Sequence, residues 1–342
     1  MYNNAVITAR DLSIGYRTKG HKEALHSSLN FSLKGGNLTC LLGPNGAGKS
    51  TLLRTLSASQ PILGGELMLT GRMIESFSEK ELSRTIGLVL TEKTFAGALT
   101  VRQLVSLGRQ PHTGFFGHLS AYDKEIVEHA LHLTGIDHKA DTYTAQLSDG
   151  ERQKAMIAKA IVQECPIILL DEPTAFLDAV SRIEILTLLH RLAHDENKAI
   201  LLSTHDIEQA LVTADYLWLL TSENGIHCGV TEDVILSGMM DRLFPEADIK
   251  FDIMHGGFSP TVKANHSIIL HTEDQVLKHW TQNALNRHGF LCLEESLATD
   301  KKELPELYVL SRSEINLNIE GRKHSCCSYG ELIDLLSVLN YR

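Results

Sequence analysis

The stretch "GPNGAGKST" (residues 43–51) decides the fold of this chain. Its spacing fits the pattern G-x-x-x-x-G-K-[ST], which ends here on Gly48, Lys49 and Ser50. The preceding "LTCLLG" (residues 38–43) is apolar like a buried strand, and the following "STLLRTLS" (residues 50–57) has helical spacing. A glycine-rich turn between strand and helix lets successive backbone N–H groups converge on an anion. We therefore predict a phosphate-binding loop rather than an ordinary exposed turn.

Each part of this loop has an expected role toward a bound nucleotide. Lys49 is expected to reach the β- and γ-phosphates of a nucleotide, and the Ser50 hydroxyl is expected to bind Mg²⁺. The residues predicted to bind the nucleotide are Gly43, Pro44, Asn45, Gly46, Ala47, Gly48, Lys49, Ser50 and Thr51.

Two carboxylates follow a second apolar strand in "IILLDEP" (residues 167–173). Asp171 could hold Mg²⁺ through water, and Glu172 could polarise the water that attacks the γ-phosphate. Paired carboxylates are also common where loops begin, so alone they would be weak evidence. Together with the phosphate loop they predict a site of nucleotide hydrolysis.

Composition limits the classes of function. The 342 residues suffice for about two domains, and 43% of them are hydrophobic. A net charge of −10 disfavours a nucleic-acid binder. Six scattered cysteines without a C-x-x-C pair argue against a disulfide framework or a zinc finger. Without a long apolar run or a signal-peptide pattern, we expect a cytosolic chain.

The order of patterns along the chain predicts an α/β fold. Residues 4–43 alternate like several short strands, with "YRTKGHKEA" (residues 16–24) as a loop, and the pattern turns helical at about residue 95. Beyond residue 147, strands alternate with helices, which predicts a mostly parallel sheet covered on both faces. We expect "MHGGFSP" (residues 254–260) to be a linker. Residues 261–342 then predict a small α+β domain.

Over residues 1 to about 260, this order of motifs resembles the ATP-binding subunits of ABC transporters. The family signature LSGGQ has its counterpart in "LSDGERQ" (residues 147–153). From the residues alone, Ser148 and Glu151 form a capping box at the start of a helix. The resemblance implies that Ser148 and Gly150 contact the γ-phosphate of ATP held by a second copy of the chain. Each ATP site would then need two chains arranged head to tail.

Three further positions match the family. In "FLDAV", Asp178 takes the place of an aspartate that lies at the dimer interface, although it could simply cap a helix. In "STHD", His205 corresponds to a histidine that contacts the γ-phosphate, whereas a lone histidine at a strand end is usually structural. Tyr16 matches the aromatic residue that stacks on adenine, although a tyrosine at a strand end is often half-buried surface.

Two positions depart from the family. Thr91 stands where a glutamine usually contacts Mg²⁺ and signals to the membrane subunit, and its hydroxyl is too short to copy that contact. Asp149 replaces a signature glycine and adds a carboxylate where a phosphate would approach. The resemblance implies a P-loop ABC ATPase core over residues 1–255, with an antiparallel β subdomain and a helical subdomain at about residues 95–163. Residues 261–342 would be an accessory domain.

The pattern "LTV…LV.LGR.PH" (residues 99–112) is similar to the subfamily that imports iron–siderophore complexes, haem or cobalamin. The expected partners are a second copy of the chain, an integral-membrane permease and, indirectly, a solute-binding protein, with no nucleic acid. The expected location is the cytoplasmic face of the membrane. One alternative is a soluble ABC-type ATPase acting on nucleic acid or ribosomes, which the single motif set and the acidic charge disfavour. Another is a non-hydrolysing regulator, which Glu172 disfavours.

Overall fold

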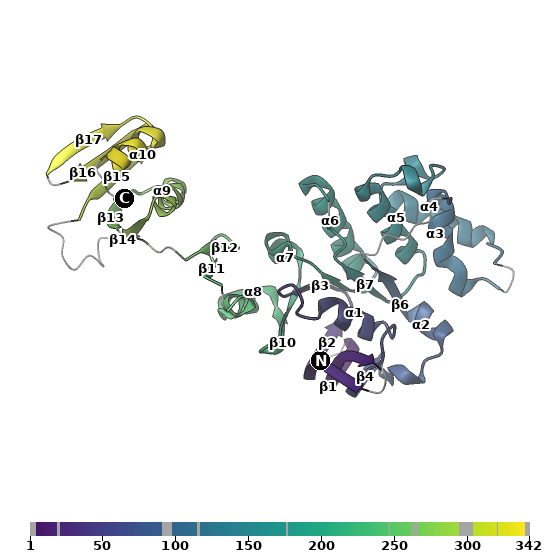
Figure 1. The fold of residues 1–342 in the computed structure, drawn as a ribbon. Coiled ribbons are helices and arrows are strands. Elements are labelled where there is room, and N and C mark those ends of the chain that lie inside the picture. The colour runs from purple at the N-terminus through teal and green to yellow at the C-terminus, as the bar shows by residue number, and fades with distance from the viewer. Residues whose placement is uncertain are drawn as a thin grey trace. The chain divides into compact units, whose positions relative to one another are not determined.

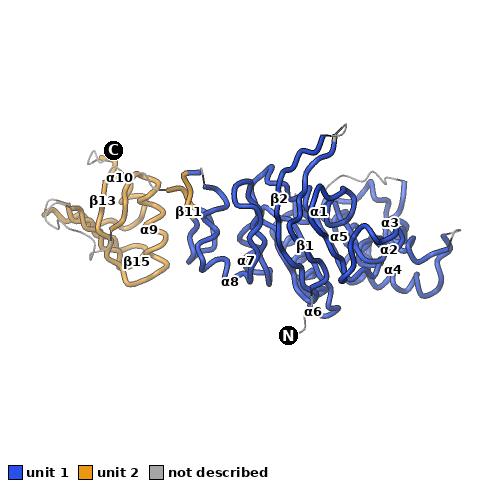
Figure 2. The backbone as a smooth tube through the Cα atoms, turned by 90° about the horizontal axis from the view of Figure 1, so that it is seen from below, with its two compact units in different colours: residues 1–247, 251–258 blue, residues 248–250, 259–342 orange. Residues whose placement is uncertain are grey.

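The computed structural model describes residues 5–18, 21–90, 98–114, 117–175, 177–245, 247–261, 264, 266–293, 304–319 and 321–338. The chain divides into two compact units (Figure 2). Unit 1 is Met1–Ala247 with Phe251–Phe258, and unit 2 is Asp248–Lys250 with Ser259–Arg342. Within the described ranges, every helix is too short or too polar to cross a membrane.

A six-stranded sheet forms the centre of unit 1, in the order β10-β9-β3-β8-β7-β6. All neighbouring pairs are parallel except β10 with β9. Except for the edge strand β10, its strands read as nearly continuous apolar runs because helices or a second sheet cover both faces. The strands are β3 (Asn37–Leu42), β6 (Ile86–Val89), β7 (Ile167–Asp171), β8 (Ala199–Ser203), β9 (Tyr216–Thr221) and β10 (Gly225–Val230).

A second, antiparallel sheet has the order β2-β1-β4-β5. Its strands are β1 (Ala5–Thr18), β2 (His21–Lys34), β4 (Gly64–Leu69) and β5 (Arg72–Met73). The predicted loop at residues 16–24 is wrong for most of its length, because Tyr16 pairs with Glu23 and Gly15 with Ala24. Main-chain pairing of the two strands therefore continues through residues whose side chains are too polar to give a strand signal.

Helix α1 (Lys49–Leu56) lies between the two sheets (Figure 1). Its Leu52 and Leu53 share one apolar cluster with Ile7 of β1 and Leu41 of β3. The neighbouring Cys40 and Leu42 point to the other face of β3, where α6 (Ala179–Asp195) packs. Neighbouring side chains of β3 are thus buried on opposite faces, which holds the strand in one orientation. The end of the strand, where the phosphate loop begins, is therefore fixed as well. Shorter helices α7 (Ile207–Thr213) and α8 (Thr231–Leu236) complete the core.

The helical part of unit 1 contains α3 (Val101–Ser106), α4 (Ala121–Leu133) and α5 (Asp149–Ile161). The 3-10 helices η2 (Leu107–His112), η3 (Asp137–Lys139) and η4 (Thr144–Gln146) connect them. Between β5 and β6 lie η1 (Ile74–Ser76) and α2 (Glu79–Thr85), which the sequence interpretation missed.

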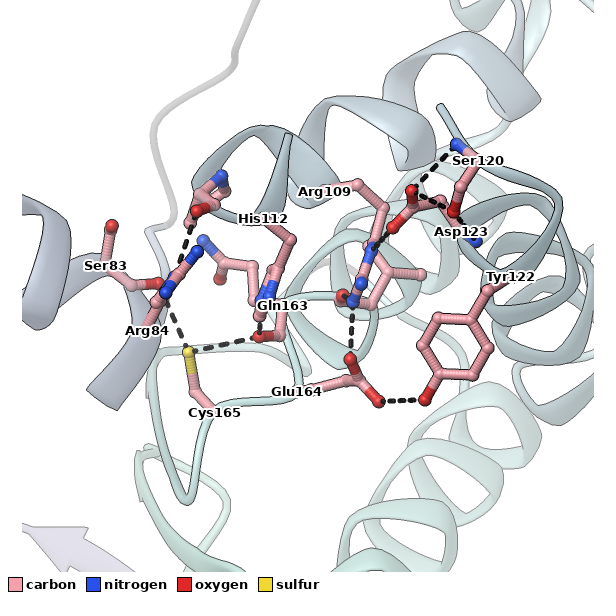
Figure 3. A network of polar contacts seen from close by, with 12 residues as sticks. Ser83, Arg84, Arg109, His112, Ser120, Tyr122, Asp123, Gln163, Glu164 and Cys165 are labelled. Carbon is pink, nitrogen blue, oxygen red and sulfur yellow. Dashed lines mark hydrogen bonds and ion pairs between the residues drawn. The ribbon is translucent and has the colours of Figure 1, made fainter. Parts of the chain in front are cut away.

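A polar network joins η2 to the chain that follows α5 (Figure 3). Arg109 is buried and donates to the Asp123 carboxylate at 2.8 Å, to the Glu164 carboxylate at 2.6 Å and to the Val162 carbonyl at 2.7 Å. His112 contacts the Gln163 carbonyl through Nε2 at 2.9 Å. The arginine and histidine of the "LGR.PH" pattern therefore bind η2 to residues 162–164, which connect α5 to β7.

Unit 2 is a five-stranded sheet with two helices, ordered β14-β13-β15-β16-β17. Strands β13 (His266–His271) and β14 (Phe290–Leu293) are parallel and joined through α9 (Gln275–Arg287). The antiparallel β15 (Glu306–Ser311), β16 (Glu314–Ile319) and β17 (Arg322–Cys326) precede α10 (Tyr329–Val338). An apolar cluster of its own, which includes Phe290, Leu307 and Leu332, supports this unit.

The predicted linker at residues 254–260 contains the boundary between the two units, at Phe258 and Ser259, but it is not an irregular segment. Strands β11 (Ile249–Asp252) and β12 (Gly257–Pro260) form a hairpin there. The Asp252 carboxylate accepts the N–H groups of Met254 and His255, and Gly256 takes φ +69°, so the chain reverses within four residues. The glycines that suggested a linker form this tight turn.

Candidate active site

The loop between β3 and α1 has the backbone of an anion cradle. Gly46 and Gly48 have φ +81° and +91°, values that a residue with a Cβ rarely adopts. Gly48 is the N-cap of α1, and as a glycine it has no side chain to cap the N–H groups there. A Cβ built on Gly46 would meet no atom within 4 Å, so the space beside the loop is open. At Gly43, by contrast, a Cβ would lie 2.2 Å from the Leu220 carbonyl oxygen, so only glycine fits.

Lys49 is buried beside this loop. Its Nζ donates to the carbonyl oxygens of Gly43 at 2.8 Å and Pro44 at 3.0 Å. Burial lowers the pKa of the Lys49 ammonium, and the negative charges of Glu172 and Asp171 oppose that shift. The ammonium therefore lies inside the loop and within the field of both carboxylates.

Two side chains from the antiparallel sheet contact the loop region. His26 of β2 is buried, and its Nε2 lies 2.7 Å from the Ala47 carbonyl oxygen. Tyr16 of β1 is half exposed, and its hydroxyl lies 3.1 Å from Thr51 Oγ1 in α1. Sequence reasoning missed His26, because its partner is 21 residues away and the surrounding strand gives no signal for the contact.

The two carboxylates lie at the end of β7, next to the end of β8. Asp171 pairs with Ser203 in the sheet register, and Ser203 Oγ donates to Asp171 Oδ1 at 2.7 Å. The same hydroxyl accepts the N–H of Glu172 at 2.9 Å. Glu172 has φ +49°, a left-handed backbone that is uncommon for a residue with a side chain. Ser203 belongs to "STHD", and its role could not be predicted because its partner Asp171 is 32 residues away.

His205 and Glu172 are in direct contact, His205 Nε2 with Glu172 Oε1. Both line a cavity of about 580 Å³ together with Thr174, Arg182 and Asp206. Arg182 pairs with Asp206 at 2.7 Å, and Asp206 caps α7 by accepting the N–H of Gln209. The structure thus brings the predicted base and the predicted histidine to one cavity wall.

The signature residues lie around a different cavity, of about 290 Å³. Ser148 caps α5 and forms the predicted capping box with Glu151. Gly150 packs close to the start of α6, since an added Cβ would lie 3.7 Å from Ser181 Oγ. Asp178 caps α6 by accepting the Ser181 N–H at 2.8 Å, and this hydrogen bond lowers the pKa of the Asp178 carboxyl. Ser148, Gly150 and Asp178 therefore share one cavity wall, whose residues differ from those around Glu172.

The residues present fit Mg²⁺ and a triphosphate. The loop supplies open space and N–H groups for anionic oxygens, and Lys49 adds a positive charge. Ser50 and Asp171 offer the oxygen ligands that Mg²⁺ prefers. Asp149, the departure in the signature, is paired with Arg152 at 2.9 Å, which offsets its charge. Thr91 lies outside the described residues.

The chain is similar to known proteins of one family. The family described as ABC transporter matches residues 26–175. The ferric enterobactin transport ATP-binding protein FepC of Escherichia coli is 36% identical over 240 residues, which cover 70% of this chain and 87% of that protein. This chain belongs to the ABC transporter ATP-binding proteins. As a member of that family it is an ATP-binding ATPase, as predicted.

Other similar proteins belong to the same family. The iron(3+)-hydroxamate import ATP-binding protein FhuC of Bacillus subtilis is 34% identical over 247 residues, covering 72% of this chain and 90% of that protein. A solved metal-chelate type ABC transporter in an inward-facing conformation is similar with a TM-score of 0.61 and 30% identity, covering 71% of this chain and 90% of that chain. The predicted fold class is confirmed. The names of these relatives favour a transport protein over the nucleic-acid alternative.

Proposed function

We propose that this chain is the ATPase subunit of a membrane importer for iron–siderophore complexes. The observation that carries the proposal is the convergence of Lys49, Asp171 and Glu172 beside an open glycine loop. The relatives named for ferric enterobactin and iron(3+)-hydroxamate supply the substrate class. Haem and cobalamin remain related candidates from the sequence pattern alone.

The cradle residues 43–51 would bind the phosphates of ATP, with Lys49 neutralising the charge on the terminal phosphates. Tyr16 would stack on adenine, which its exposed ring and its position next to Thr51 support. Bound Mg²⁺ would neutralise phosphate charge, and Ser50 and Asp171 would hold it. The described residues do not include Thr91, so its assignment to the metal rests on the sequence alone.

Glu172 would accept a proton from the attacking water, because its carboxylate lies at the strand end beside the cradle. His205 is already in contact with that carboxylate and would hold it in place and contact the terminal phosphate. Ser203 donates to Asp171 and accepts the N–H of Glu172, so it holds the Asp171 carboxylate against the main chain of Glu172.

Ser148, Gly150 and Asp178 would act toward ATP held by a second copy of the chain. Their shared cavity wall includes the N-terminus of α5, where N–H groups and the helix dipole favour an anion. ATP would close two copies head to tail, and hydrolysis would reopen them. The movement would act on an integral-membrane permease that receives its solute from a binding protein.

The proposed location is the cytoplasmic face of the membrane, reached through the permease. Residues 1–255 would be the ATP-binding domain, with a helical subdomain at about residues 95–163. Residues 261–342 would be the accessory α+β domain. The separate apolar cluster of unit 2 supports this division.

The test is ATP turnover by the Glu172→Gln variant, with Glu208→Gln as control. Glu208 lines the same cavity but does not follow a buried strand. We expect Glu172→Gln to lose about 100-fold or more in turnover while still binding ATP, because a general base contributes about 10²–10⁴-fold. Glu208→Gln should hydrolyse ATP like the unaltered chain. Normal turnover by Glu172→Gln would refute the assignment.

The importer hypothesis has a separate test. The chain is purified from its native cells in mild detergent, and the proteins that accompany it are identified. A polytopic membrane protein encoded with a siderophore-binding protein is the expected partner. Ribosomal or DNA-bound proteins in its place would contradict the proposal, even if ATP turnover depends on Glu172.

A further inference from the structure

We propose that His190, His194 and Asp215 form a binding site for a divalent transition-metal ion of the Zn²⁺ class. The three residues lie in unit 1, away from the residues assigned to ATP. His190 and His194 are four residues apart on α6, and Asp215 immediately precedes β9. One ligand atom from each residue lies within 4.8 Å of the other two.

The helix places both imidazoles on one face. Residues separated by four positions in an α-helix project from the same side, and two histidines at this spacing are a known arrangement for binding zinc. The two rings lie 4.4 Å apart between centroids with an angle of 36° between their planes. Both rings direct Nε2 toward the same carboxylate.

The distances match those of a metal site. His194 Nε2 lies 3.3 Å from Asp215 Oδ1, and His190 Nε2 lies 3.7 Å from the same oxygen. Two ligand atoms that each lie about 2.0–2.1 Å from a tetrahedral ion are about 3.4 Å from one another. Small rotations of the two exposed rings would therefore suffice to place an ion between the three atoms.

Hydrogen bonds hold the Asp215 carboxylate in position before an ion binds. Asp215 Oδ2 accepts the N–H of Leu38 at 2.7 Å, and the Asp215 N–H donates to the Leu38 carbonyl at 2.9 Å. The Asp215 carbonyl in turn accepts the N–H of Thr231 at 3.2 Å. A ligand that is fixed by hydrogen bonds loses less conformational freedom on binding, and such outer contacts raise metal affinity.

The ligand set selects the class of ion. Two imidazoles and one carboxylate suit Zn²⁺ and its neighbours Co²⁺ and Ni²⁺, whereas Mg²⁺ and Ca²⁺ prefer oxygen ligands. The His190 and His194 side chains are 41% and 46% exposed, which leaves a fourth position open to water. A bound ion would tie the last turns of α6 to the start of β9.

The site is independent of the importer proposal. Asp178 caps the first residue of α6, whereas His190 and His194 lie in its last two turns. The 17 residues of α6 span about 26 Å, so this cluster lies far from the cavity that Asp178 lines. Loss of metal binding and loss of ATP turnover are therefore separable.

The test is a Zn²⁺ titration of the full-length, tag-free chain in competition with a chromophoric chelator, in excess Mg²⁺. The Mg²⁺ occupies oxygen-ligand sites, so that it masks any weak binding of Zn²⁺ beside ATP. The variants are His190→Gln and His194→Gln. The matched control is His132→Gln, because His132 also lies 3.3 Å from a carboxylate, that of Asp137, but outside the cluster.

We expect the unaltered chain to bind one equivalent of Zn²⁺ tightly. Each cluster variant should weaken this step by about tenfold or more, and His132→Gln should leave it unchanged. Co²⁺ should give a visible absorption band that is lost in the same two variants. Saturating Zn²⁺ should raise the midpoint of thermal unfolding in the unaltered chain and not in His194→Gln.

Two results would overturn the proposal. One is a titration of the unaltered chain without a step at one equivalent. The other is a step of equal affinity in a chain that carries both His190→Gln and His194→Gln. Circular dichroism of each variant before the titration establishes that the fold is intact, so that a lost step reports lost ligands.

Discussion

Replacing Arg109 by methionine should destabilise unit 1 more than any change of an exposed arginine. The Arg109 side chain is 2% exposed and donates to two carboxylates and a carbonyl (Figure 3). Methionine fills much of the same space but donates nothing, so the Asp123 carboxylate loses its charged partner. Removing one partner of a buried ion pair costs about 3–5 kcal/mol. Ser120 still donates to Asp123, so we expect about 3 kcal/mol.

The matched control is Arg102→Met. Arg102 also contacts two carboxylates, those of Glu128 and Asp141, but its side chain is 37% exposed. Exposed ion pairs contribute about 0–1 kcal/mol, so this variant should unfold almost like the unaltered chain. Combining Arg109→Met with Asp123→Asn should recover part of the loss, because the carboxylate left without its partner is then neutral.

The assay is urea unfolding followed by tryptophan fluorescence. The chain has two tryptophans, Trp218 buried in β9 of unit 1 and Trp280 on α9 of unit 2. In a Trp280→Phe background the signal comes from unit 1 alone. The expected loss corresponds to a fall of about 6–12 °C in the melting temperature. The reasoning is refuted if Arg109→Met and Arg102→Met lose equal stability.

Three further predictions concern the loop and pH. Gly43→Ala should abolish ATP binding, because the added Cβ would collide with a carbonyl of β9. Gly46→Ala has open space and should cost only about 1 kcal/mol of backbone strain. Equal ATP affinities of the two variants by calorimetry would contradict this. His26→Phe should raise the KM for ATP and cost about 1–3 kcal/mol, because a buried loop carbonyl loses its partner; unchanged kinetics and unfolding would contradict it. Hydrogen bonds from Ser120 lower the pKa of Asp123 to about 2, so the carboxylate adds stability above its unfolded pKa of about 3.9 that is lost as the pH falls toward 2. Asp123→Asn should therefore lose less unfolding free energy between about pH 5 and pH 3 than the unaltered chain does, and equal slopes would contradict this.

The sequence predicted those parts of the fold whose signals are local. Strands β7 and β8 are five-residue runs that are buried throughout, and β7 lies where the apolar run of "IILLDEP" predicted a strand. Helix α2 was missed because none of its residues is buried, so it has no apolar spacing to detect. The hairpin β16–β17 was missed although β16 alternates buried and partly exposed residues. The polar residues between its apolar side chains hid the signal.

In the candidate site, too, residues within a local motif could be predicted, whereas residues brought together only by the fold could not. The loop could be found because its residues are consecutive and follow a fixed spacing. His26 and Ser203 could not, because each acts on a residue more than 20 positions away and shares no motif with it. The cluster of His190, His194 and Asp215 was missed for the same reason: the helix brings the histidines together, but only the sheet brings in the carboxylate.

The pairing of β7 with β8 predicts how the hydrolytic site responds to heating. Asp171 and Ser203 are opposite one another in adjacent parallel strands, so their separation is set by the main-chain ladder rather than by a loop. Asp171 and Ser203 cannot drift apart while the ladder is intact. Amide protons of β7 and β8 should therefore begin to exchange with solvent at the same temperature at which nucleotide affinity is lost. The hydrolytic site and the centre of the sheet would melt as a single cooperative unit.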